Sequence, residues 1–168
     1  MTNALLVAMF ETKAWADRGL YDALLAIPDD SGADPVEMFR IRALMDHMTV
    51  VDRLFRARIA GEPEPFAGII SPVTPSFAEL RGIAAETDAW LLDYARRAMP
   101  AELEEVIAFT FTDGDPGLMT RGEMLGHILT HDAAHRGAIG FSLGRMKLKG
   151  GPDTLTSYLS WKRGSSTA

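Results

Sequence analysis

Residues 120–137, TRGEMLGHILTHDAAHRG, hold three of the four histidines in the chain. The stretch opens with a threonine followed three positions later by a glutamate, the spacing of a capping box at a helix N-terminus. His127, His131 and His135 then follow at four-residue steps. Each such step advances only about 40° around an α-helix, so the three imidazoles lie on one face. This stretch therefore predicts a helix that presents a histidine face.

Apolar residues recur three and four positions apart in the flanking sequence, which predicts further amphipathic helices. Asp34, followed by Pro35, and Ser76 have the properties of helix N-caps, and Pro28, Gly61 and Pro100 interrupt the pattern. The expected helices cover residues 3–27, 35–59, 76–98 and 121–145, with a short last helix over 154–161.

Residues 100–119 have a different pattern, with short alternation in VIAFTFT followed by the turn signal DGDPG. They predict either a short extended strand or an irregular crossover. The fold class expected from the whole chain is all-α, a four-helix bundle with long crossover connections and a short C-terminal helix. One domain is expected over 1–162, with a flexible tail at 163–168.

The composition excludes several classes of function. The chain has 168 residues, a formal charge of -6 and no cysteine. Without cysteine there is no disulfide, thiol nucleophile or iron–sulfur cluster, and the absence of clustered basic residues argues against nucleic-acid binding. No apolar run is long enough to cross a bilayer, and the start of the sequence lacks the features of a signal peptide. A cytoplasmic location is expected.

A metal site in this chain has to use His, Asp and Glu. His47 lies midway along the predicted second helix, between apolar residues. His127 and His135 are about 12 Å apart along their helix axis, too far for one ion. Helix geometry therefore predicts that His47 and one adjacent pair, either 127 with 131 or 131 with 135, bind a divalent metal. A polar core of hydrogen-bonded histidines without metal is the alternative.

Charged residues beside these histidines are interpreted more simply. Asp46 and Asp132 point about 100° away from their histidine neighbours and are expected to be solvated, with a hydrogen bond to a ring N–H group of a neighbouring helix as the alternative. Arg136 is expected either in a salt bridge or near a substrate anion. The segment HDAAH lacks the glutamate and the downstream ligand of zinc peptidases. A di-iron bundle would need two Glu-x-x-His spacings, which the sequence does not contain.

Several segments together resemble the DinB/YfiT-like helical bundles, the damage-inducible DinB family, which is unrelated to the DNA polymerase of similar name. The most specific is the histidine motif that ends in Arg136 and Gly137. The weaker matches are Lys13-Ala-Trp15-Ala-Asp17, Leu44-Met45-Asp46-His47-Met48, Asp52-Arg53-Leu54-Phe55, Ser76-Phe77-Ala78-Glu79-Leu80-Arg81 and Thr120-Arg121-Gly122-Glu123-Met124-Leu125.

The resemblance implies a metal on His47, His131 and His135, most often nickel or zinc, and a homodimer. It makes His127 a supporting neighbour of the ligands, together with Arg136. Ala138 stands where the family often has glutamine, which puts the surroundings of the site in doubt but not its ligands.

The resemblance also implies two candidate functions. One is a metal-dependent enzyme that acts on a small molecule, such as a thiol-dependent S-transferase with a small-molecule thiol substrate. The other is a non-catalytic metal-binding module of a stress response.

Overall fold

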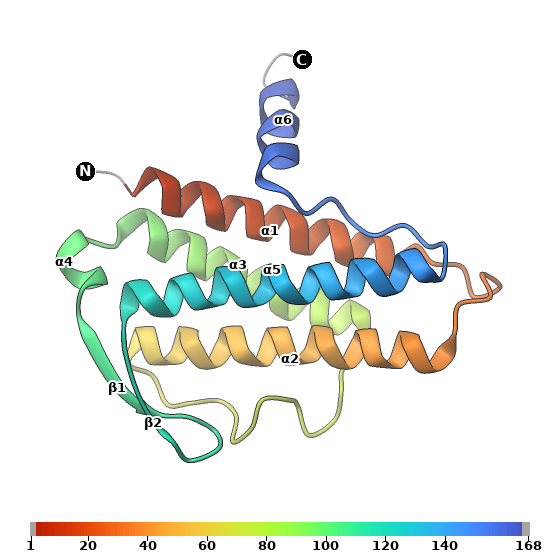
Figure 1. The fold of residues 1–168 in the computed structure, drawn as a ribbon. Helices are drawn as coiled ribbons and strands as arrows, with labels where there is room; N and C mark the ends of the chain where they lie inside the picture. The colour runs from red at the N-terminus through yellow and green to blue at the C-terminus, as the bar shows by residue number, and fades with distance from the viewer. Residues whose placement is uncertain (1–2, 166–168) are drawn as a thin grey trace.

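The computed structural model describes residues 3–165, with the side chain of Ser165 excepted. Four long helices run side by side as a bundle, which confirms the predicted all-α fold (Figure 1). They are α1 (Ala4–Leu25), α2 (Pro35–Ala60), α3 (Phe77–Arg97) and α5 (Arg121–Arg145). α1 packs most extensively on α3, and α2 packs most extensively on α5.

The helices begin where the capping residues predicted. The capping boxes at the start of α3 and α5 are both formed, between Ser76 and Glu79 and between Thr120 and Glu123. Asp34 caps α2 by accepting a hydrogen bond from the amide of Val36. α2 ends at Gly61, whose φ of 69° lies in the left-handed region that glycine adopts without a steric penalty. Short polar side chains thus fix the ends of the bundle helices.

A short helix and a hairpin connect α3 to α5. The helix is α4 (Pro100–Leu103), and strands β1 (Val106–Thr110) and β2 (Pro116–Thr120) pair antiparallel. The expected extended strand is therefore one arm of a hairpin whose second arm the sequence did not reveal. The guanidinium of Arg58 on α2 lies 4.2 Å from the ring centroid of Phe109, so a cation–π contact holds the hairpin on the bundle.

α6 (Leu155–Ser165) is the predicted C-terminal helix, and it projects away from the bundle (Figure 1). It continues past the expected end at residue 161, so residues 163–165 belong to a helix and not to the expected tail, whereas residues 166–168 lie outside the described part. Tyr158 and Trp161 of α6 pack against Trp15 of α1, with ring centroids 5.7 and 6.1 Å away.

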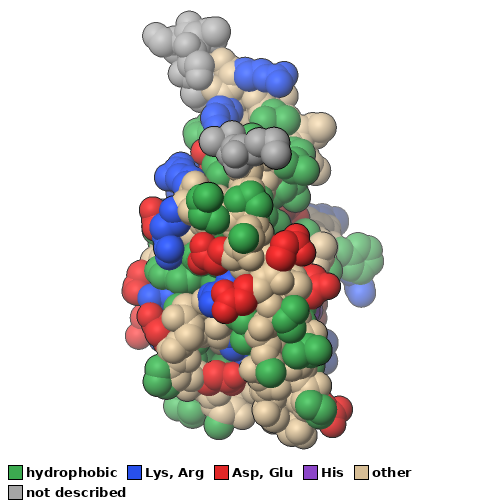
Figure 2. Space-filling view, turned by 90° about the vertical axis from the view of Figure 1, so that its left-hand side faces the viewer, with side chains coloured by type: hydrophobic (Ala, Val, Ile, Leu, Met, Phe, Trp, Pro, Cys, Tyr) green, Lys and Arg blue, Asp and Glu red, His purple; other side chains and the backbone are tan. Residues whose placement is uncertain are grey.

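Apolar side chains fill the bundle in two clusters, one around Phe10, Leu91 and Ile128 and one around Leu20, Met45 and Ile139. At the end of the bundle seen in Figure 2, apolar side chains alternate with acidic and basic ones. Among residues 3–165, no helix combines the length and the apolar character that crossing a bilayer requires.

Candidate metal centre

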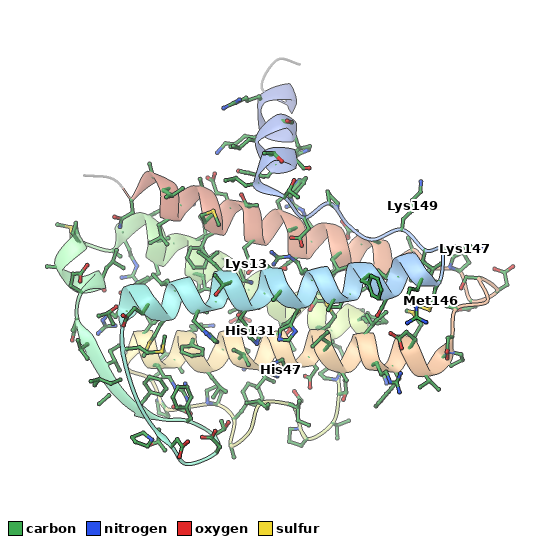
Figure 3. All side chains as sticks on the ribbon, in the orientation of Figure 1. Lys13, His47, His131, Met146, Lys147 and Lys149 are labelled. Carbon is green, nitrogen blue, oxygen red and sulfur yellow. The ribbon has the colours of Figure 1, made fainter. Side chains whose placement is uncertain are left out.

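Three imidazole nitrogens converge between α2 and α5. Nε2 of His131 lies 3.1 Å from Nε2 of His47 and 3.1 Å from Nε2 of His135. The candidate ligand atoms of the three residues all lie within 4.8 Å of one another. Figure 3 shows His47 and His131 reaching toward each other from the two helices. The structure thus brings together the three histidines that the resemblance implies.

The loop between α2 and α3 orients His47. Its Nδ1 lies 2.9 Å from the carbonyl oxygen of Ile69. Ser71, two residues further on, donates to both oxygens of Asp46, from its amide at 2.9 Å and from its hydroxyl at 2.6 Å. Asp46 is only 1% exposed, so the expectation that it is solvated is wrong. Its carboxylate fastens the loop beside His47.

Asp132 orients the ring of His131, as the carbonyl of Ile69 orients that of His47. Its Oδ1 lies 3.2 Å from Nδ1 of the histidine, and the residue is 1% exposed, so it too is not solvated as expected. Burial alone would raise the pKa of Asp132, but the charge of Lys13 and the hydrogen bond from His131 override burial and lower this pKa to about 2. A carboxylate therefore faces the outer nitrogen of His131, as in carboxylate–histidine–metal arrangements.

These contacts determine where the ring protons lie. A carbonyl or carboxylate oxygen only accepts, so Nδ1 carries the proton in His47 and in His131 when the rings are neutral. Their Nε2 atoms then face each other as lone pairs at 3.1 Å, a contact that is repulsive without a cation between them. Tetrahedral coordination with metal–nitrogen bonds of 2.0–2.1 Å separates ligand nitrogens by roughly 3.3 Å. The residues present thus fit a divalent metal.

The surroundings of His135, the third candidate ligand, favour its neutral form. Burial is the main cause that lowers the pKa of His135, and the neighbouring His131 and His47 lower it further. All three ligand histidines are half-buried, so the site lies near the surface. Neutral imidazoles are the form that binds a metal.

His127 and Arg136 do not belong to the group of side chains whose nitrogens converge on the candidate metal position. The ring of His127 lies 4.7 Å from that of Phe55 and 5.3 Å from that of His131, as a packing neighbour. Arg136 is 7% exposed and pairs with Asp17 at 2.8 Å and Asp153 at 2.7 Å. Of the two expectations for Arg136, the salt bridge is confirmed, because its guanidinium forms ion pairs with both aspartates.

The histidine motif falls within a longer match to a known family. A family model described as the DinB superfamily matches residues 19–139, well over half of the chain. The chain belongs to the DinB superfamily. Searches of curated proteins and of solved structures gave no match. The match includes all three ligand candidates.

Behind the histidines, this DinB-superfamily bundle contains a buried ionic cluster that sequence reasoning missed. Nζ of Lys13, 2% exposed, lies within 2.9 Å of one carboxylate from each bundle helix (Figure 3 shows the lysine). The four residues are Asp17, Asp52, Asp88 and Asp132. A signal was present, because Lys13 and Asp17 lie four residues apart within an apolar helix stripe.

An ammonium has three N–H groups, so it cannot donate to all four carboxylates at once. Asp17 and Asp88 accept well-formed hydrogen bonds from Lys13, whereas Asp52 and Asp132 interact with it as ion pairs. Burial raises the pKa of Asp52 well above its usual value. The cluster thus connects the metal centre, through Asp132, to the remaining helices of the DinB bundle.

We expect Asp132→Asn to weaken metal binding by about 10- to 100-fold, because the neutral amide orients His131 less firmly and does not stabilise its bound state. Competition with a chromophoric chelator measures the affinity. Asp52→Asn is the matched control, since it replaces a carboxylate of the same cluster that contacts no histidine, and its metal affinity should change by no more than about threefold. Equal losses in both variants would show that the overall cluster charge, and not the contact with His131, controls the metal.

Proposed function

We propose that this protein is a divalent-metal-dependent enzyme acting on a small molecule. The observation that supports the proposal is the convergence of three Nε2 atoms from half-buried histidines, His47, His131 and His135. Three protein ligands leave at least one coordination position for a substrate, which is typical of catalytic sites and not of structural ones.

The donor set favours nickel or zinc. Imidazole nitrogens bind late first-row divalent ions more tightly than manganese, and the site has no thiolate donor because the chain has no cysteine. Calcium and magnesium require oxygen ligands, which this site does not supply among the described residues. The ligand chemistry does not choose between nickel and zinc, so metal analysis of the purified protein decides it.

We propose thiol-dependent S-transfer as the reaction class. A divalent ion, when bound, would lower the pKa of a thiol that occupies the open position. The protein's own contribution is orientation: Ile69 and Asp132 hold two of the rings through their outer nitrogens, and the three histidines are half-buried. The chemistry that the bound ion would supply is transfer of a thiolate, formed by loss of the thiol proton to solvent, to an electrophilic carbon from which a leaving group would depart.

A conjugation assay tests this function. Metal-loaded protein is mixed with chlorodinitrobenzene and, in turn, glutathione, cysteine and other low-molecular-weight thiols, and formation of the thioether with release of chloride is followed by absorbance. Turnover should disappear after chelation and in His131→Ala. If the protein binds metal with one ion per site but no thiol is conjugated, the enzyme proposal is wrong, and the non-catalytic metal-binding module becomes the better description.

The homodimer that the resemblance implies stays a prediction. Exposed apolar residues such as Phe141 and Trp161, at 69% and 48% exposure, are available for contacts between copies. Size-exclusion chromatography with light scattering measures the mass directly.

A further inference from the structure

A second polar feature lies on the side of the bundle away from the histidines. The metal centre is built by α2 and α5, whereas a cavity of about 270 Å³ lies between α1 and α3. This volume is just below the range of pockets for drug-sized ligands, so it suits a smaller metabolite. Small apolar side chains form its walls, chiefly Ala14, Ala84, Ala85 and Leu92.

The most informative residue in this cavity is Asp88. Its side chain is 7% exposed, and its Oδ1 accepts a hydrogen bond of 2.6 Å from Lys13. Its other carboxylate oxygen accepts no hydrogen bond from any described residue. This second oxygen is not enclosed by protein atoms, and the cavity that Asp88 lines is where a donor would be placed.

The charges around Asp88 show what kind of donor is missing. Four carboxylates gather around Lys13, and the only other described cation paired with them is Arg136. The buried carboxylates of this cluster therefore outnumber their described cationic partners. Burial raises the pKa of Asp88 to about 7, so near neutral pH the residue is divided between its protonated and ionised forms. A cationic donor in the cavity would stabilise the ionised form.

The mouth of the cavity has the opposite charge. Arg18 and Arg81 line it, and Arg81 is paired with Asp22 at 2.7 Å. Arg18 is exposed and has no ion pair or hydrogen bond with a described residue. A guanidinium in this position attracts a carboxylate. A bare metal ion does not fit, because the apolar walls cannot supply the several oxygen ligands that it needs.

We propose that the cavity between α1 and α3 binds a short aliphatic amino carboxylate, with its ammonium on the unpartnered oxygen of Asp88 and its carboxylate on Arg18. The alkyl chain lies along the alanine walls. This site is separate from the metal centre and does not depend on the proposed enzymatic function.

The test uses δ-aminovalerate as the probe, with pentylamine and pentanoate as analogues that each carry one of its two charges. Because amino carboxylates chelate metals, binding is measured on the metal-free full chain and on His131→Ala, by calorimetry and by amide shifts in nuclear magnetic resonance. Saturable binding below about 10 mM is expected, with shifts at Asp17 and Asp88. Pentylamine should bind more weakly and pentanoate not at all.

Two variants test the site, one by changing its charge and one by filling its volume. Asp88→Asn removes the charge and should weaken binding at least about tenfold, and Ala85→Leu fills the cavity while leaving every charge in place, with a similar loss. Asp93→Asn is the matched control, since this aspartate is exposed on the same helix and, within the described part of the chain, forms an ion pair with Arg97 alone. Arg18→Gln should abolish the preference for δ-aminovalerate over pentylamine.

The pH dependence provides an independent readout. The charged groups around Asp88 are Lys13, Asp17 and Arg18 from α1, Arg81 from α3, Asp52 from α2 and Asp132 from α5. Since the pKa of Asp88 is about 7, affinity should fall about tenfold between pH 8 and pH 6 as this carboxylate takes up a proton. The proposal is overturned if no saturable binding occurs, or if both Asp88→Asn and Ala85→Leu bind as tightly as the unmodified protein.

Discussion

Replacing Lys13 by methionine is expected to lower the free energy of unfolding by at least about 3–5 kcal/mol at pH 8, the loss that follows when one partner of a buried ion pair is removed. Methionine keeps the length of the side chain but leaves four buried carboxylates with Arg136 as their only described cationic partner. A domain has only about 5–15 kcal/mol in total, so much of the variant should be unfolded. Urea denaturation followed by circular dichroism measures the loss.

The defect should depend on pH. Without Lys13, the pKa values of Asp52 and Asp88 rise further above those of the unfolded chain, near 3.9. The folded variant then binds more protons than the unfolded chain above about pH 4, so its stability falls as pH rises. The loss should accordingly be smaller at pH 5 than at pH 8.

Lys149→Met is the control, because this lysine is exposed on the connection to α6, and its effect should stay within about 0.5 kcal/mol (Figure 3). Adding Asp52→Asn and Asp88→Asn to Lys13→Met should restore much of the stability by removing two uncompensated charges. A loss below about 1 kcal/mol in Lys13→Met at pH 8 would mean that the four carboxylates are already neutral in the folded protein.

His131→Ala is expected to weaken metal binding by more than about 100-fold, a larger loss than that of a residue that only supports a ligand. His131 is the middle ligand, since its Nε2 lies 3.1 Å from those of both His47 and His135. Removing it leaves two nitrogens on different helices. Equilibrium competition with a chelator and elemental analysis measure the affinity and the stoichiometry.

His127→Ala is the matched control on the same helix face. Its ring packs against Phe55 and does not reach the point where the three Nε2 atoms meet, so metal affinity should fall by no more than about threefold, and stability should drop through the lost ring contact. Equal losses in the two variants would show that His127 is a ligand. Less than about a tenth of an equivalent of metal in the loaded wild-type protein would favour a polar core without metal.

The parts of this structure that follow from local rules were predictable. Helix periodicity and the capping pairs at Ser76 and Thr120 located the bundle helices to within a few residues. The four-residue steps placed the histidines on one face but left two adjacent pairs possible. Only the family resemblance selected His131 with His135, because the choice depends on the axial position of His47 on a different helix, which helix geometry alone does not fix.

The parts that depend on tertiary neighbours were not predictable from local rules. Asp46 and Asp132 were expected in solvent because adjacent helix positions diverge by about 100°. That angle is correct, but the direction away from each histidine meets a loop in one case and the interior of the bundle in the other. Arg136 was ambiguous for the same reason. Its partners, Asp17 and Asp153, are 119 and 17 residues away in the chain.

The loop contact to His47 has a consequence for how the sequence can change. The acceptor at position 69 is a main-chain carbonyl, which every amino acid supplies, so the nature of the side chain there does not affect the proton on Nδ1. The position of the loop depends instead on Ser71, whose hydroxyl and amide donate hydrogen bonds to Asp46. A library of substitutions along residues 62–75 should therefore retain metal binding at the apolar, exposed position 69 and lose it at 71.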